Sequence, residues 1–256
     1  FVVSGASKRG WTTWLAGAVD PRVCALVPVV IDMLNMKAQT QWAQRVYGRQ
    51  SEKISDYTDI GLMERLDQPE AARLLEIVDP FSYRAAFTMP KLLLLGTNDP
   101  YWTVDALRHY WNDLPGPKLV YQAPNAGHGA GGTEGAARAR AAFLQMIAQG
   151  KPPPQVSWRR QDGAADALHV EADRRARGAR LWQAHAPTRD FRKAVWTSAP
   201  LALDAQGQRA TAPLPAPAEG FAAYMAELSF SEDGRDFQLS TQVYVSPDLP
   251  PHQPWK

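Results

Sequence analysis

Three short segments carry a serine, an aspartate and a histidine, each directly after an apolar run. They are Gly5-Ala6-Ser7-Lys8-Arg9-Gly10, Gly96-Thr97-Asn98-Asp99 and Asn125-Ala126-Gly127-His128-Gly129. A hydroxyl that attacks, an imidazole that takes its proton and a carboxylate that orients the imidazole are the parts of a nucleophilic triad. Since the carboxyl ends of parallel strands meet at one edge of a sheet, the three segments can converge there. Ser7, Asp99 and His128 are therefore the candidate catalytic residues.

The carboxylate is the member of this set that the sequence leaves open. Asp99 follows its apolar run at the expected place, although an aspartate there also suits a turn. Asp32, at the end of another predicted strand, is an alternative acid, and Asp105 is a third. Trp102, in the loop after Asp99, is a candidate to line a substrate pocket, where an aromatic face suits a sugar or an acyl group.

The neighbours of Ser7 bear on its role. A serine before a helix is also a favoured N-cap. The backbone amide of Lys8, at the helix N-terminus, would donate to an oxyanion. The Lys8 side chain is an alternative base, which we disfavour because adjacent side chains on a turn diverge. The pattern G-x-S-x-G is not kept, because Arg9 stands where a glycine is usual and Gly10 follows it. We expect the Arg9 side chain to point outward.

Residues 1–151 are expected to form an α/β domain. Apolar runs alternate with helical patterns, which is typical of a parallel sheet with crossover helices. The order Ser, Asp, His is that of the α/β-hydrolases. Residues 33–88 are too long for a plain crossover, so we expect them to form a helical cap inserted over the site. The strands are expected at residues 1–4, 25–31, 89–96 and 118–122, and helices from residue 8, at 105–113 and at 133–149.

The chain begins at a strand that should lie inside a sheet. A strand buried on both faces does not suit the edge of an incomplete sheet, and the first residue is Phe1 rather than Met. We therefore expect the C-terminal portion of a longer protein, holding the C-terminal half of an α/β-hydrolase parallel sheet. A second oxyanion amide would then lie upstream.

A second domain is expected at residues 152–256. Lys151-Pro152-Pro153-Pro154 is a stiff linker, because consecutive prolines cannot continue a helix. Beyond it, short segments of alternating hydrophobicity follow at regular spacing, which favours an all-β immunoglobulin-like or fibronectin-like sandwich. We expect this domain to be almost free of helix and to have its own core, built on Trp158, Trp182, Trp196, Phe230 and Tyr244.

Composition excludes several classes of protein. The formal net charge is +2, from 28 basic and 26 acidic residues that are interspersed, so no footprint for nucleic acid is present. No apolar stretch reaches the roughly 20 residues of a membrane helix. The single cysteine excludes an internal disulfide. The histidines show no metal-ligand spacing, so no metal and no cofactor is expected.

Six motifs in order carry a family resemblance. They are Gly5-Ala6-Ser7-Lys8-Arg9-Gly10-Trp11-Thr12-Thr13-Trp14, Val19-Asp20-Pro21-Arg22-Val23, Val78-Asp79-Pro80-Phe81-Ser82-Tyr83, Met89-Pro90-Lys91, Leu114-Pro115-Gly116-Pro117-Lys118 and Pro124-Asn125-Ala126-Gly127-His128. Together they resemble the PhoPQ-activated pathogenicity-related family, an α/β-hydrolase-like group. The resemblance implies a hydrolase-like domain followed by a β-rich domain, commonly in exported bacterial proteins, periplasmic or secreted. It implies no particular substrate.

These patterns lead to one preferred function and two alternatives. The preferred function is that of a serine hydrolase, which cleaves an ester or amide of a small molecule, a carbohydrate or a peptide through an acyl-enzyme. One alternative is an inactive hydrolase-like protein that binds or signals, with the β-sandwich as its protein contact surface. The other is an exopeptidase, since hydrolase domains of exopeptidases share this triad order. The serine hydrolase and the exopeptidase need a reactive Ser7, whereas in the inactive protein Ser7 does not react.

Overall fold

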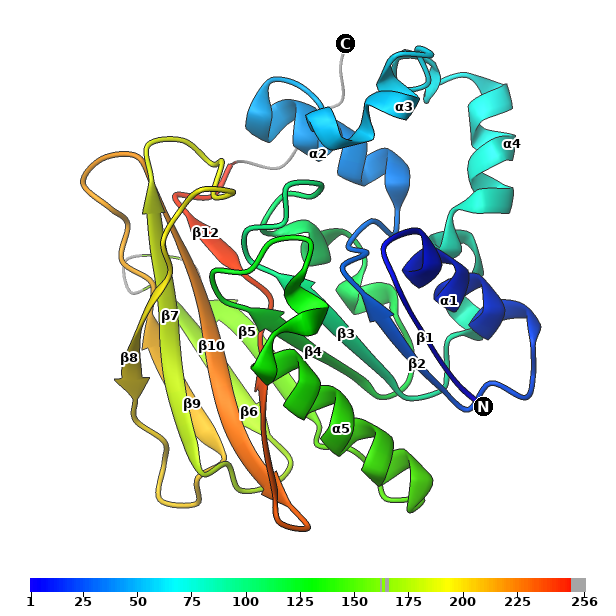
Figure 1. The fold of residues 1–256 in the computed structure, drawn as a ribbon. Helices are drawn as coiled ribbons and strands as arrows, with labels where there is room; N and C mark the ends of the chain where they lie inside the picture. The colour runs from blue at the N-terminus through cyan, green and yellow to red at the C-terminus, as the bar shows by residue number, and fades with distance from the viewer. Residues whose placement is uncertain (162, 164–165, 250–256) are drawn as a thin grey trace.

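A parallel sheet forms the first part of the computed structural model, which describes residues 1–161, 163 and 166–249 (Figure 1). Four strands lie in the order β1-β2-β3-β4, so that neighbours in space are also consecutive strands in the chain. Each neighbouring pair is parallel. All four strands therefore end at the same edge of the sheet. Their bounds are Val2–Ala6, Ala25–Val29, Lys91–Gly96 and Lys118–Ala123.

Helices cover both faces of this sheet. Successive side chains of a strand point to opposite faces, and β3 shows this directly. Leu92 and Leu94 pack with α5 (Glu134–Ala148), whereas Leu93 and Leu95 pack with Trp14 of α1 (Lys8–Val19). Burial on both faces explains why β2 and β3 read as continuous apolar runs rather than alternating ones.

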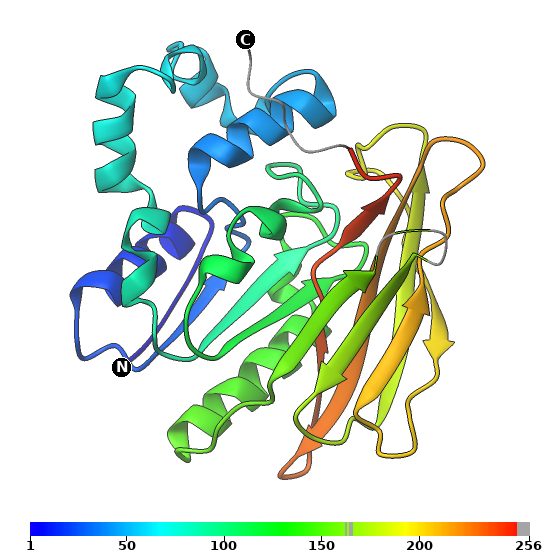
Figure 2. The same cartoon turned by 180° about the vertical axis from the view of Figure 1, so that it is seen from behind.

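A helical insert joins β2 to β3. Figures 1 and 2 show it on the side of the sheet at which the strands end. Asp79 holds its two ends together, because its carboxylate accepts hydrogen bonds from the amides of Asn35, Met36 and Phe81. The insert consists of α2 (Met36–Tyr47), η1 (Glu52–Ile54), α3 (Ser55–Thr58), η2 (Met63–Arg65), α4 (Pro69–Val78) and η3 (Pro80–Ala86).

The prediction of one continuous helix at residues 105–113 is wrong. Two short 3₁₀ helices, η4 (Ala106–His109) and η5 (Trp111–Asp113), stand in its place. Tyr110 separates them with a φ of −153°, outside the helical range. The buried Tyr110 hydroxyl donates to Asp32 at 2.6 Å, and this tertiary contact accompanies the break.

The rest of the described chain is antiparallel. A three-stranded sheet has the order β5-β6-β9 and a five-stranded sheet the order β11-β10-β7-β8, with β12 paired to β10 (Figure 2). Among the described residues from 156 to 249 no helix occurs. The immunoglobulin-like arrangement stays a prediction. The strands are Val156–Gln161, Ala167–Ala172, Gly178–Ala186, Thr197–Leu201, Arg209–Pro213, Phe221–Glu232, Arg235–Ser240 and Tyr244–Ser246.

The prediction of a separate core for the antiparallel part holds only in part. Trp196, with Trp182 packed against it, belongs to a smaller apolar cluster that this part of the chain forms almost by itself. The larger cluster is shared. One apolar cluster runs from β2, β3, β4 and α5 through β6, β9, β10 and β11, and it includes Phe230. Trp158 stacks on Trp111 with ring centroids 4.9 Å apart. The Gln122 amide of β4 donates to Ser240 Oγ at 3.0 Å. The two parts share a core because the antiparallel sheets cover apolar surface that β4 and α5 present; a domain boundary near residue 151 stays a prediction.

No helix in the described part of the chain is long and apolar enough to cross a membrane.

Candidate active site

Ser7 occupies a strained turn between β1 and α1. Its φ is 57° and its ψ is −125°, a conformation that non-glycine residues rarely adopt. The turn is held because the Ser7 amide donates to the Val29 carbonyl of β2 at 2.9 Å. Ser7 makes no side-chain cap bond to α1, so its hydroxyl is not engaged as a helix cap. The sharp turn leaves that hydroxyl at the carboxyl edge of the sheet.

Gly5 and Gly10 allow the close approach of α1 to the sheet at this turn. A Cβ at Gly5 would lie 2.5 Å from the Arg9 carbonyl oxygen, and one at Gly10 would lie 2.7 Å from Cγ2 of Ile31. Gly10 is buried and Arg9 is exposed. The departure from G-x-S-x-G is therefore accommodated, because the tight contact falls at Gly10 while the Arg9 side chain points outward as expected.

His128 contacts both of its predicted partners. Its Nε2 lies 2.8 Å from Ser7 Oγ, across 121 residues of sequence, and its Nδ1 lies 2.8 Å from Asp99 Oδ2. The Asp99 side chain is 7% exposed and that of His128 is 24% exposed. A shielded carboxylate beside a partly open imidazole is the arrangement in which the acid orients the base while the base can reach a substrate.

The loop after β3 supplies two further contacts to this set. Asp99 Oδ1 accepts a hydrogen bond from the Tyr101 amide at 3.0 Å, which leaves Oδ2 for His128. The Tyr101 ring lies over the His128 ring, with centroids 4.1 Å apart and planes 31° from parallel. The sequence analysis missed Tyr101. Its only signal was its place two residues after Asp99.

Lys8 is the first residue of α1. The first amides of a helix have no acceptor within it, so the Lys8 N–H is available at this terminus. The Lys8 side chain is exposed. His128 Nε2 lies 2.8 Å from Ser7 Oγ, and His128 is therefore the candidate base at this serine.

The two alternative acids have other partners. Asp32 accepts the Tyr110 hydroxyl at 2.6 Å, and burial raises the pKa of Asp32 to about 7. Asp105 binds Arg189 at 2.8 Å and also accepts from Trp42 Nε1 at 2.9 Å. Burial opposes ionisation of Asp105, but the nearby arginines lower its pKa. Both carboxylates are buried, and Asp99 is the one that contacts His128.

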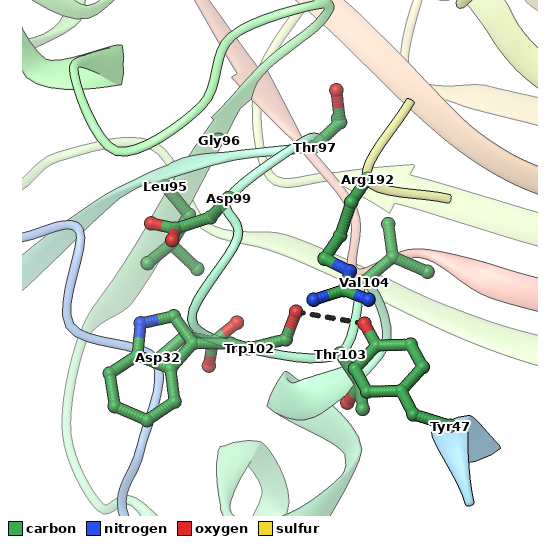
Figure 3. Close-up of a pocket in the computed structure, with 10 residues that line it drawn as sticks. All are labelled: Asp32, Tyr47, Leu95, Gly96, Thr97, Asp99, Trp102, Thr103, Val104 and Arg192. Atoms are coloured by element: carbon green, nitrogen blue, oxygen red, sulfur yellow. Dashed lines mark hydrogen bonds between the residues drawn. The ribbon is translucent and has the colours of Figure 1, made fainter. Parts of the chain in front are cut away.

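Trp102 lines a small pocket beside Asp99 (Figure 3), with room for about one water molecule. The Trp102 carbonyl accepts from the Tyr47 hydroxyl of α2 at 3.2 Å. Trp102 Nε1 is buried without a hydrogen-bond partner. Asp32 lines the same pocket, so the two candidate acids lie on one cavity.

Among the described residues no group of three or more His, Cys, Asp or Glu side chains is placed to hold a metal ion.

Solved structures similar to this chain include two acetyl xylan esterases. That from Paenibacillus sp. R4 has a TM-score of 0.43 and 20% identity, over 58% of this chain and 44% of the other. Acetyl xylan esterase 1 from Thermoanaerobacterium sp. JW/SL YS485 has a TM-score of 0.44 and 18% identity, over 57% of this chain and 45% of the other.

Comparison of sequences identifies the family more clearly than comparison of structures does. Autocrine proliferation repressor protein A of Dictyostelium discoideum is 39% identical over 161 residues, which are 62% of this chain and 33% of that protein. The chain thus matches about a third of the length of this relative. The model of one family matches residues 1–192, three quarters of the sequence and all of the residues that form the site. The chain belongs to the PhoPQ-activated pathogenicity-related protein family.

Proposed function

We propose that this chain carries the catalytic site of a serine hydrolase, in which Ser7 is the nucleophile, His128 the general base and Asp99 the residue that orients and stabilises His128. The observation that carries the proposal is the unbroken series of contacts at 2.8 Å from Ser7 Oγ through His128 to Asp99 Oδ2. The strained backbone of Ser7 supports it, since strain of this kind is typical of a nucleophile elbow.

The reaction would proceed in two balanced halves. Ser7 Oγ attacks the carbonyl carbon of an ester or amide while its proton passes to His128 Nε2. The same proton then passes to the departing alcohol or amine, which leaves Ser7 acylated. Water next attacks the acyl carbon, gives its proton to His128, and releases the acid as Ser7 recovers its proton. The Lys8 amide would donate to the oxyanion in both halves.

The substrate is proposed only as a class. The pocket beside Asp99 holds about one water molecule and is lined by neither Ser7 nor His128, so it does not select a substrate, and the class follows from the chemistry of Ser7, His128 and Asp99. We propose an ester of a small molecule or of a carbohydrate, and a peptide amide is the alternative. Export, which the family resemblance implies, stays a prediction.

The test is covalent labelling of the full-length protein with a fluorophosphonate probe, which phosphonylates an activated serine. We expect one label on Ser7, none in Ser7→Ala and almost none in His128→Ala. Hydrolysis of p-nitrophenyl acetate should follow the same order. A folded protein that takes no label would overturn the proposal in favour of an inactive binding protein. Hydrolysis of aminoacyl p-nitroanilides without that of the acetate ester would indicate the exopeptidase instead.

A further inference from the structure

We infer that residues 187–196, which join β7 to β8 in the antiparallel part of the chain, position Asp99 and His128 for reaction by holding Asn98 and Asn125. The inference rests on the proposed function, because it assigns a role within the same triad. The antiparallel region would then help to position the triad, although it supplies none of the three reacting side chains.

Asn98 is the stronger of the two connections. Its Nδ2 donates to backbone carbonyls of three residues in the segment, those of Phe191 at 3.2 Å, Arg192 at 3.4 Å and Ala194 at 2.8 Å. A side-chain amide has two protons to donate, so this cluster of acceptors uses its full donor capacity. The side chain of the residue directly before Asp99 is thereby fixed to the segment that joins β7 to β8.

Asn125 makes a reciprocal pair with the end of the segment. The Trp196 amide donates to Asn125 Oδ1 at 2.7 Å, and Asn125 Nδ2 donates to the Trp196 carbonyl at 2.9 Å. Asn125 has a φ of 58°, a left-handed conformation that asparagine tolerates. It is exposed, so water competes for its bonds and its contribution should be smaller than that of Asn98.

The loop after β3, which carries Asp99, and the loop after β4, which carries His128, are also hydrogen-bonded to each other at these asparagines. The backbone N–H of Asn98 donates to the Ala126 carbonyl at 3.0 Å, and the backbone N–H of Asn125 donates to Thr97 Oγ1 at 3.0 Å. Thr97 Oγ1 in turn donates to Asn98 Oδ1 at 2.7 Å. The loops that carry Asp99 and His128 therefore form one hydrogen-bonded unit, and residues 187–196 bind it from one side.

The segment can act as a support because it is itself firmly anchored. Phe191 and Trp196 are buried in the core of the antiparallel part, at 1% and 2% exposure. Arg189 forms a buried ion pair with Asp105 at 2.8 Å. Arg192 pairs with Glu52 of the helical insert at 3.1 Å. A displacement of about 1 Å in a reacting group can cost about a hundredfold in rate, so a rigid support next to Asp99 affects the chemistry.

The experiment compares three variants of the full-length protein. Asn98→Ala and Asn125→Ala remove the two connections. Lys151→Ala is the control, because it breaks a different contact with the antiparallel part, the ion pair at 2.6 Å between Lys151, just after α5, and Asp233 in the turn between β10 and β11. We expect the limiting rate of Ser7 labelling to fall about 30- to 100-fold in Asn98→Ala and about 3- to 10-fold in Asn125→Ala. Probe affinity should be unchanged, and Lys151→Ala should label within about twofold of the wild type.

Labelling is measured well below the unfolding temperature of each variant. A folded Asn98→Ala protein that labels within twofold of the wild type overturns the inference, and so does an equal loss in Lys151→Ala. If Asn98→Ala does not fold, Asn98→Ser, which keeps a shorter donor, replaces it with the same criteria.

A second measurement separates this inference from the proposed function. The proton between His128 Nδ1 and Asp99 should give a low-field proton NMR signal in the wild type. We expect that signal to move or to disappear by exchange in Asn98→Ala and to remain in Lys151→Ala. A wild type that shows the signal but takes no label overturns the proposed function alone. An unchanged signal in Asn98→Ala overturns the positioning role.

Discussion

The loops after β2 and β3 each place an aspartate just beyond a buried parallel strand, yet the two carboxylates have opposite surroundings. Asp99 contacts His128 Nδ1 at 2.8 Å and accepts a hydrogen bond from the backbone amide of Tyr101. Asp32 faces the hydroxyl of the fully buried Tyr110, and the nearest charges that act on it are those of Asp99 and Asp105. Both line one pocket.

This difference shows how partners assign roles to chemically identical groups. Burial is similar, since Asp32 is 5% exposed and Asp99 is 7% exposed. At Asp32 burial and two nearby negative charges outweigh one hydrogen bond, so its pKa rises to about 7. The loop after β3 supplies the carboxylate that can stabilise an imidazolium. The loop after β2 supplies a carboxyl group that keeps its proton up to about pH 7.

Replacing each aspartate by asparagine tests the comparison most strongly. Asp99→Asn should lower the rate of Ser7 labelling by about 10³- to 10⁴-fold, because the amide no longer holds His128 in the tautomer that accepts the Ser7 proton. Asp32→Asn should label within about tenfold of the wild type, because Asp32 does not contact His128. The measurement is the second-order labelling rate of the folded variants; a larger loss in Asp32→Asn than in Asp99→Asn would reverse the assignment.

The stability of the two forms should depend differently on pH. The folded pKa of Asp32 is about 7 and the unfolded value is 3.8, so the native state binds the extra proton between these values. The wild-type free energy of unfolding therefore falls at this site from about pH 4 to pH 7 and is level above. Asp32→Asn lacks that fall and should gain, relative to the wild type, on the order of 4 kcal/mol between pH 4 and pH 8.

Urea denaturation at several pH values measures this gain. The same titration of Asp99→Asn serves as the comparison from the other loop. A constant difference between Asp32→Asn and the wild type from pH 4 to pH 8 would show that Asp32 ionises normally.

Removing the Tyr110 hydroxyl sharpens the account of the β2 loop. Tyr110→Phe deletes the donor at 2.6 Å from Asp32, a bond that lowers the pKa of Asp32 against the effect of burial. We expect a loss of about 1–2 kcal/mol in the free energy of unfolding at pH 8. The pH at which stability becomes level should also move upward. Denaturation across pH, beside Asp32→Asn, checks both effects; in the double variant the upward movement should be absent.

The smallest effect is expected from Tyr101 in the β3 loop. Tyr101→Leu removes the ring that lies over His128 and leaves the backbone amide that donates to Asp99. An aromatic contact of this kind contributes about 0.5–1.5 kcal/mol, so labelling should slow about 2- to 12-fold. Tyr101→Phe keeps the ring and is the control. Equal rates for the leucine and phenylalanine variants would show that the ring does not affect the imidazole.

Much of the parallel region could be predicted from the sequence because its signals are local. The apolar runs of β2 and β3 reflect burial on both faces, and the motifs around Ser7, Asp99 and His128 follow strands directly. Asn98 and Asn125 lie inside those same motifs, yet their importance was not visible. Their partners are backbone carbonyls and an amide near residues 191–196, and a backbone group leaves no mark in the sequence.

The sequence by itself determined the four parallel strands to within two residues at each end, the order of Ser7, Asp99 and His128, and the change from parallel to antiparallel structure near residue 151. Each depends on residues that are neighbours in the chain, such as an apolar run followed by a turn. Only the tertiary structure decided which aspartate faces His128, why two 3₁₀ helices flank Tyr110, and that both parts share a core. Those outcomes depend on which groups from distant segments meet in a shared, water-poor interior, where each buried polar group needs a partner.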